Sequence, residues 1–161
     1  MSQRHDLGVI ARSIIDSNQY MTLGTADEAG RPWVSPVWYA SAEYREFYWV
    51  SSPAATHSRN LATRPQVSIV IFDSRAPIGT GQAVYMSALA EELEGVDLDW
   101  SIAIFSRRSE AHGASEWKPQ DVRPPAVHRL YRATASEHWV LDPAGHPVHG
   151  RALDHRTAVK V

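Results

Sequence analysis

Short runs in which apolar and polar residues alternate, each bounded by turn-forming residues, fill most of this chain. A repeat of two places every second side chain on one face of an extended strand, whereas a helix would scatter these residues around its surface. The runs are also rich in aromatic and β-branched residues, which pleated sheets favour. Strands are therefore expected at 20–25, 33–39, 47–51 and 67–72, within 79–93, and at 127–133 and 138–141.

Six or seven short strands with a few helices predict a small antiparallel barrel, because closing a sheet on itself removes its exposed edges. The helical spacing of Leu7, Ile10 and Ile14 predicts an amphipathic helix that ends near Asn18. Residues 97–108 predict a second helix, and one or two further helical turns are expected before Pro65. No repeat or linker divides the 161 residues, so we expect a single domain, residues 1–161.

The composition excludes several classes of function. Sixteen Lys plus Arg residues against eighteen Asp plus Glu give a formal charge of -2, so no basic field is present to attract nucleic acid or an anionic membrane. The chain has no Cys, which rules out disulfides, Cys-ligated zinc, iron–sulfur clusters and a Cys nucleophile. No apolar run approaches the roughly 20 residues of a membrane span, and no signal peptide is recognisable. We expect a cytoplasmic protein.

The histidines near the end of the chain do not form a metal motif. His138, His146, His149 and His155 lack the helical spacing and the neighbouring carboxylate of a zinc peptidase site. We interpret them as incidental residues of a solvated tail, and we expect no metal site. A Gly-x-Ser-x-Gly sequence is also missing, so a serine hydrolase has no support.

Two segments carry groups suited to a flat ligand with an anionic tail. Pro36 cannot donate a backbone hydrogen bond, so its strand is expected at a sheet edge or a bulge, where Val37 and Trp38 can turn free backbone groups toward a ligand. Residues 56–59, Thr-His-Ser-Arg, combine two hydroxyls, an imidazole and a guanidinium at the opening of a short helix. Unpaired amides and the helix dipole already favour an anion at that position.

The order and spacing of segments 22–25, 30–39, 47–51, 56–61 and 81–91 resemble the pyridoxamine 5'-phosphate oxidase-like family of FMN-binding split barrels. The resemblance implies a mainly β (α+β) fold, an antiparallel split β-barrel with flanking helices that assembles as a homodimer. It implies a flavin (FMN)-binding oxidoreductase that acts on a small organic substrate. Because the flavin itself carries the electrons, no side chain is nominated as catalytic.

The resemblance also assigns cofactor contacts to individual residues. The strand along the isoalloxazine ring would carry Ser35, Pro36, Val37 and Trp38, and the neighbouring strand would carry Val50 and Ser51. The phosphate would be bound by Thr56, His57, Ser58 and Arg59, and the pyrimidine edge by Gln82. Tyr131 and Trp139 are candidates to cover the ring from the second subunit.

Two positions depart from the family. Its members often have Lys where this chain has His57 and Arg where this chain has Ser35. A protonated His57 would replace one of these charges, and flavin affinity is then expected to fall between mildly acidic and mildly alkaline pH. The missing charges leave two alternatives open. One is a reductase that uses the deazaflavin F420 on the same barrel, and the other is a protein that binds flavin or haem without turnover.

Overall fold

The computed structural model describes residues 6–141 and 155–161. Three α-helices, eight strands and a short 3-10 helix lie in these ranges. In chain order they are α1 (Leu7–Ser17), β1 (Tyr20–Ala26), β2 (Pro32–Trp38), β3 (Ala40–Ala42), β4 (Glu46–Ser51), α2 (Thr56–Thr63), β5 (Gln66–Phe72), β6 (Ala83–Glu92), α3 (Gly95–Ala111), the 3-10 helix (Pro119–Val122), β7 (Arg129–Leu141) and β8 (Arg156–Val159).

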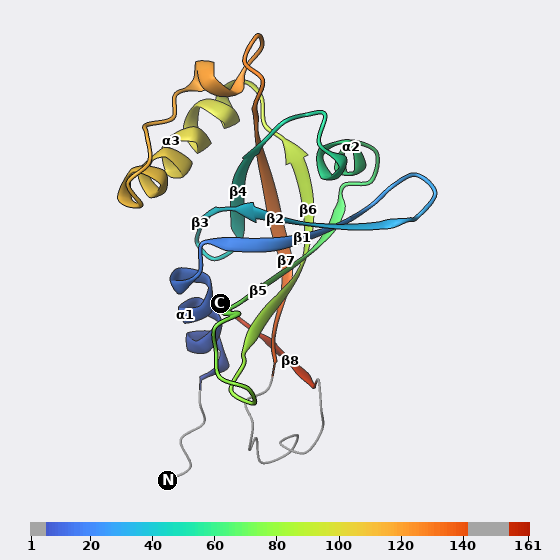
Figure 1. Ribbon diagram of the computed structural model, residues 1–161, viewed down its shortest axis with the longest axis vertical. Coiled ribbons are helices and arrows are strands. Elements are labelled where there is room, and N and C mark those ends of the chain that lie inside the picture. Colours follow the sequence, from blue (N-terminus) through green and yellow to red (C-terminus); the bar gives the residue numbers. More distant parts are fainter. Residues whose placement is uncertain (1–5, 142–154) are drawn as a thin grey trace.

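The strands form one antiparallel sheet in the order β2-β1-β5-β6-β7-β4-β3, and β8 pairs with β7. Only Tyr39 separates β2 from β3 in the chain, although these strands stand at opposite ends of that order. The sheet must therefore curl until its two ends approach each other, and Figure 1 shows the long strands wrapped in this way. The predicted mainly β, antiparallel split barrel with flanking helices is confirmed.

Tyr39 ties the curled sheet to the first helix. Its side chain is fully buried, and its hydroxyl donates a hydrogen bond of 2.5 Å to the backbone oxygen of Ile15. The same helix buries Ala11 and Ile15 completely against the barrel. The helix begins at Leu7, where the Asp6 carboxylate accepts a hydrogen bond from the Gly8 amide and so acts as its N-cap.

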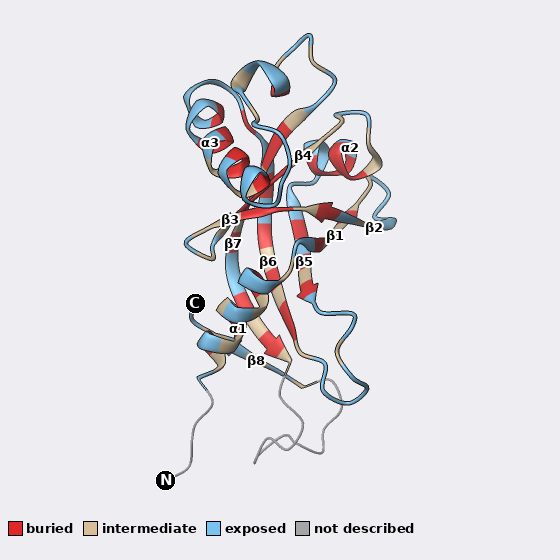
Figure 2. Cartoon of the chain, turned by 60° about the vertical axis from the view of Figure 1, so that its left-hand side comes forward, coloured by how far each residue is buried: buried red, intermediate tan, exposed pale blue. Residues whose placement is uncertain are grey.

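Inward-facing side chains form two apolar clusters, visible as the buried stretches in Figure 2. The larger cluster fills the barrel with residues such as Met21 and Ile69. The smaller cluster holds α3 against the sheet through Leu98, Ile102 and Phe105. No helix in the described part of the chain is long and apolar enough to cross a membrane.

The last two predicted strands are one continuous strand, β7. Its pairing with β6 shifts register between Ser87, opposite Glu137, and Ala88, opposite Ala135, so Ser136 has no partner and forms a bulge. The bulge interrupts the alternation of polar and apolar residues, which made the sequence pattern look like two strands. The short strands β3 and β8 were not predicted, because three or four residues carry too little periodicity to be recognised.

His138 is not part of a solvated tail, so that interpretation was wrong. It lies on β7 with 8% of its surface exposed, and its Nε2 lies 2.8 Å from the backbone oxygen of Tyr44. Burial lowers the pKa of His138, so the neutral ring donates this hydrogen bond at neutral pH. His146 and His149 lie outside the described residues.

Candidate functional site

A cavity of about 590 Å³ lies between the sheet and α3, and we call it the β2–α3 pocket. Five parts of the chain meet there: the start of β1, the end of β2, the end of β4, the start of α2, and the last turns of α3 with the segment that follows. Its volume is in the range of sites for cofactors and other small organic molecules. The described chain holds no group of three or more His, Asp or Glu residues arranged to bind a metal ion.

The end of β2 supplies backbone to the pocket. Within the described sheet β2 pairs only with β1, so its second edge has no strand partner. Pro36, Val37 and Trp38 line the pocket from this strand, as expected from the missing amide proton of Pro36. Unpaired backbone donors and acceptors beside a cavity suit the polar edge of a flat heterocycle.

Aromatic rings form the wall on the side of α3. The ring of Phe105 meets Trp38 edge-on with 5.2 Å between centroids, and it meets Trp117 in the same way at 5.8 Å. His112 stands against Trp38 at 5.8 Å, and His128 against Trp117 at 6.1 Å. Each ring fixes the angle of its neighbour, so the wall is preorganised for a planar apolar ligand.

His57 and Ser51 provide the buried polar pair of the pocket. The Nε2 atom of His57 lies 2.9 Å from the Ser51 hydroxyl oxygen, and His57 is 9% exposed. Burial lowers the pKa of His57, so the ring is neutral at neutral pH when the pocket holds no anion. The protonated His57 expected from the sequence therefore depends on an anion in the pocket, which would favour the charged ring.

The pocket contains no fixed positive charge from the residues that line it. Among the described lining residues the only groups able to become cationic are His57, His112 and His128. The guanidinium of Arg108 lies over the Trp38 ring at 6.0 Å, but this residue does not line the pocket and donates to the backbone oxygen of Asn18. The N-cap of α2, Ala55, makes no side-chain cap hydrogen bond, so the first amides of α2 are left without a side-chain acceptor.

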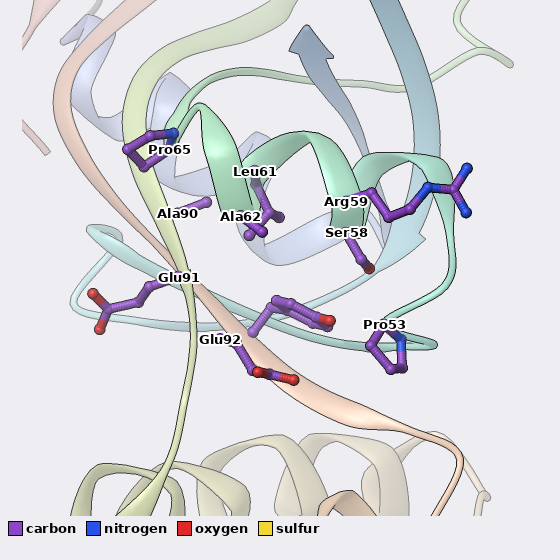
Figure 3. Close-up of a pocket in the computed structure, with 10 residues that line it drawn as sticks. Pro53, Ser58, Arg59, Leu61, Ala62, Pro65, Ala90, Glu91 and Glu92 are labelled. Atoms are coloured by element: carbon purple, nitrogen blue, oxygen red, sulfur yellow. The ribbon is translucent and has the colours of Figure 1, made fainter. Parts of the chain in front are cut away.

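The structure brings six of the predicted cofactor residues together in this pocket: Pro36, Val37, Trp38, Val50, Ser51 and His57. The predicted phosphate cluster is divided, because Ser58 and Arg59 line a second cavity bounded by α2 and β6 (Figure 3). The Arg59 guanidinium donates a 2.5 Å hydrogen bond to the backbone oxygen of Ala54. Thr56 is the first residue of α2 and does not line the pocket.

Four other residues predicted to contact the cofactor do not line this pocket either. The Ser35 hydroxyl accepts a hydrogen bond of 2.9 Å from the Trp33 indole and does not line the pocket. Gln82 stands just before β6, three strands away from β2 in the sheet, and does not line it either. Tyr131 is buried and stacks on Trp49 at 5.6 Å, so it belongs to the barrel of its own chain. Trp139 lies on β7 opposite Tyr85 and Ala158.

Sequence reasoning missed the α3 side of the pocket. Phe105, Ser109, His112, Trp117 and His128 all line it. The aromatic residues around the end of α3 were a visible signal, but nothing local indicates that this segment packs against residues some seventy positions earlier in the chain.

Comparison with solved structures supports the fold. A haem-binding protein from Mycobacterium smegmatis is 20% identical and superposes with a TM-score of 0.70 over 99% of this chain and 59% of its own. The haem storage protein HutZ from Vibrio cholerae is 21% identical, with a TM-score of 0.67 over 87% of this chain and 99% of its own. An F420 reductase is 17% identical, with a TM-score of 0.58 over 79% of this chain and 94% of its own. This chain thus spans 59% of the length of the first of these structures.

No match was found among the curated proteins. The sequence model described as pyridoxamine 5'-phosphate oxidase does match, over residues 11–139, which include most of the described barrel and all three helices in whole or in part. With the curled antiparallel sheet and the pocket beside its free strand, this match shows that the chain belongs to the pyridoxamine 5'-phosphate oxidase family.

Proposed function

We propose that this protein binds FMN in the β2–α3 pocket and works as an oxidoreductase on a small organic molecule. One observation carries the proposal: the pocket combines a free strand edge, an aromatic wall and a buried Ser–His pair. A flavin needs all three: the free strand edge would bind its polar edge, the aromatic wall would cover its ring faces, and the Ser–His pair would bind its remaining polar atoms. The bound flavin would supply the hydride or electron transfer.

The residues of the pocket fit the ring of the cofactor. Trp38, Phe105 and Trp117 would cover the apolar ring and keep water away from it. The backbone of 36–38 would align its edge by hydrogen bonds. Ser51 and His57 are held in one orientation by their mutual hydrogen bond, so they would present a donor and an acceptor at a defined place.

The phosphate would depend on backbone amides and not on fixed cations. The first turn of α2 reaches the pocket at His57, and no side chain caps it. Free amides at a helix start bind phosphate through hydrogen bonds and the local dipole. An anion at this place would also favour protonation of His57, which ties phosphate binding to proton uptake.

We also propose that the protein is a homodimer through the outer face of β2, β1 and β5. The strand registers place eight uncharged residues on this face: Tyr20, Thr22, Gly24, Val34, Pro36, Ser68, Val70 and Phe72. Tyr20, Val34 and Phe72 are 61%, 67% and 49% exposed, which is unusual for a lone monomer surface. Tyr20 and Pro36 also line the pocket, so a second copy on this face would border it.

Cofactor binding is tested by titrating FMN, F420 and haemin separately into the purified full chain. We expect FMN to bind at one site per chain, to shift its visible absorption and to remain bound through gel filtration. Retention of F420 alone would support the deazaflavin alternative, and the absence of FMN binding would overturn the proposal.

Light scattering tests the dimer. Val34→Asp is expected to give monomers, whereas Val9→Asp, on the exposed side of α1, should leave the mass of the particle unchanged.

Haem is the second candidate, and the imidazoles of the pocket favour it. His57 is buried and neutral, and His112 and His128 stand at the same pocket. A neutral imidazole is a common axial ligand for haem iron. The haemin titration separates the two candidates: a sharp Soret band that is lost in His57→Gln, His112→Gln or His128→Gln would identify a haem protein, and unchanged free-haemin spectra would exclude one.

A further inference from the structure

The second cavity of the structure, of about 500 Å³, is bounded by α2 and by β6, and we call it the α2–β6 cavity. It is lined by different residues from the β2–α3 pocket, in which we place the cofactor. Leu61, Ala62, Pro65 and Ala90 give it an apolar wall, as Figure 3 shows. Its volume is sufficient for a small organic molecule.

Ser58 places an unsatisfied polar atom in this cavity. The residue is 3% exposed, and its hydroxyl oxygen has no partner at hydrogen-bonding geometry in the described part of the chain. Figure 3 shows its side chain pointing down from α2 into the cavity. Buried polar groups in native proteins are nearly always paired, so this hydroxyl, which lies beside the Tyr131 phenol without meeting hydrogen-bond geometry, has hydrogen-bonding capacity left for a molecule in the cavity.

Tyr131 stands next to this hydroxyl, and Glu92 stands next to Tyr131. They are cross-strand neighbours on β7 and β6, and both line the cavity. Burial raises the pKa of the Tyr131 phenol, the neighbouring Ser58 hydroxyl opposes that rise, and the charge of Glu92 adds to it. Ser58, Tyr131 and Glu92 therefore form a group of oxygen atoms in which only the carboxylate is charged.

The charges around the cavity favour a cation over an anion. Glu91 is held by Arg132 at 2.6 Å, whereas Glu92 meets Arg129 only at 3.5 Å and keeps about a third of its side chain exposed. Arg59 lines the cavity, but its guanidinium is turned to the backbone oxygen of Ala54 and points away in Figure 3. Glu92 is thus the carboxylate with the most unused hydrogen-bonding capacity.

We propose that the α2–β6 cavity is a binding site for a small primary amine with an apolar body. The ammonium group has three N–H donors, which match the carboxylate of Glu92, the hydroxyl of Ser58 and the phenol or ring face of Tyr131. The hydrocarbon part lies along Leu61, Ala62 and Ala90. This site is independent of the cofactor, because it takes no residue from the β2–α3 pocket.

Benzylamine is the probe, and benzyl alcohol and benzoate are its neutral and anionic counterparts of the same size. Binding to the full chain is measured by ligand-detected NMR and by calorimetry. We expect saturable binding of benzylamine at one site per chain, and binding of the other two compounds at least about tenfold weaker, since a charge-assisted hydrogen bond is lost. Equal binding of benzoate, or no saturable binding of benzylamine, would overturn the proposal.

The matched variants are Glu92→Gln and Glu91→Gln, which remove one carboxylate each from adjacent residues. Glu92→Gln is expected to weaken benzylamine binding about tenfold or more, while Glu91→Gln changes it less than about threefold. Ser58→Ala serves as a second test that leaves the charge intact, with an expected loss of about threefold to tenfold. Urea unfolding of every variant confirms that it is folded. Affinity that is the same in Glu92→Gln and Glu91→Gln would refute the assignment.

Discussion

Replacing Phe105 with Leu tests whether the aromatic wall is built for binding as well as for stability. Phe105 is 5% exposed and meets both Trp38 and Trp117 edge-on. Leu keeps most of the apolar volume but removes both ring contacts, each of which contributes about 0.5–1.5 kcal/mol. We therefore expect the free energy of unfolding to fall by about 1–3 kcal/mol in urea titrations.

The same substitution is expected to weaken FMN binding. Without the ring of Phe105, Trp38 and Trp117 each lose the neighbour that fixes their angle on this side of the pocket, so the ligand must order them on binding. Ordering costs about 0.5–1.5 kcal/mol per side chain, so two side chains correspond to an affinity loss of about fivefold to a hundredfold. Quenching of flavin fluorescence measures this affinity, without urea and at one fixed protein concentration for all variants.

Phe47→Leu is the matched control. Phe47 is fully buried and packs against the Tyr39 ring at 5.9 Å, but it does not line the β2–α3 pocket. We expect Phe47→Leu to lower stability by about 0.5–1.5 kcal/mol and to leave FMN affinity unchanged. If both variants lose affinity equally, or if Phe105→Leu is destabilised but binds FMN as the wild type does, the wall has no specific role in binding.

Three further predictions concern the barrel. Burial lowers the pKa values of His57 and His138 below the ordinary 6.5, so below about pH 6.5 the unfolded chain binds protons that the folded chain does not. In urea titrations we expect the free energy of unfolding to stay level above about pH 6.5 and to fall as the pH decreases below it, with a smaller slope in His138→Gln. Deletion of Ser136 removes the bulge but keeps Ser87 opposite Glu137 and Ala88 opposite Ala135, so His138 and Val140 still face inward; we expect a loss of less than about 3 kcal/mol in urea unfolding, and a larger loss would contradict the register. Tyr39→Phe loses the hydrogen bond to Ile15 and should lower the free energy of unfolding by about 1–3 kcal/mol, because a buried carbonyl is left unpaired; a smaller effect in thermal unfolding would mean that another donor replaces it.

The sequence was most informative where a residue constrains its own backbone. Pro36 cannot donate to a neighbouring strand, and β2 is indeed at the end of the sheet. Gly30, in the turn between β1 and β2, adopts a φ of 80°, which its lack of a Cβ allows without strain. The first helix was equally clear, because three apolar residues at helical spacing need a common surface to bury.

The division of segment 56–59 between two cavities could not be read from the sequence. Successive residues on an α-helix point about 100° apart. When this segment forms the start of α2, His57 faces the β2–α3 pocket, while Ser58 and Arg59 face the α2–β6 cavity. Four polar residues in a row therefore looked like one site, although the helix places three of them at two cavities and Thr56 at neither.

The alternation along the chain was sufficient to predict strands, a barrel and an edge at Pro36, because each of these follows from neighbouring residues. The makeup of the pocket was settled only by tertiary packing. Phe105, His112, Trp117 and His128 reach the β2–α3 pocket because α3 buries its apolar side on the sheet next to β4. Such contacts join residues far apart in the chain, and their energy depends on distances in space, which no local pattern of residues records.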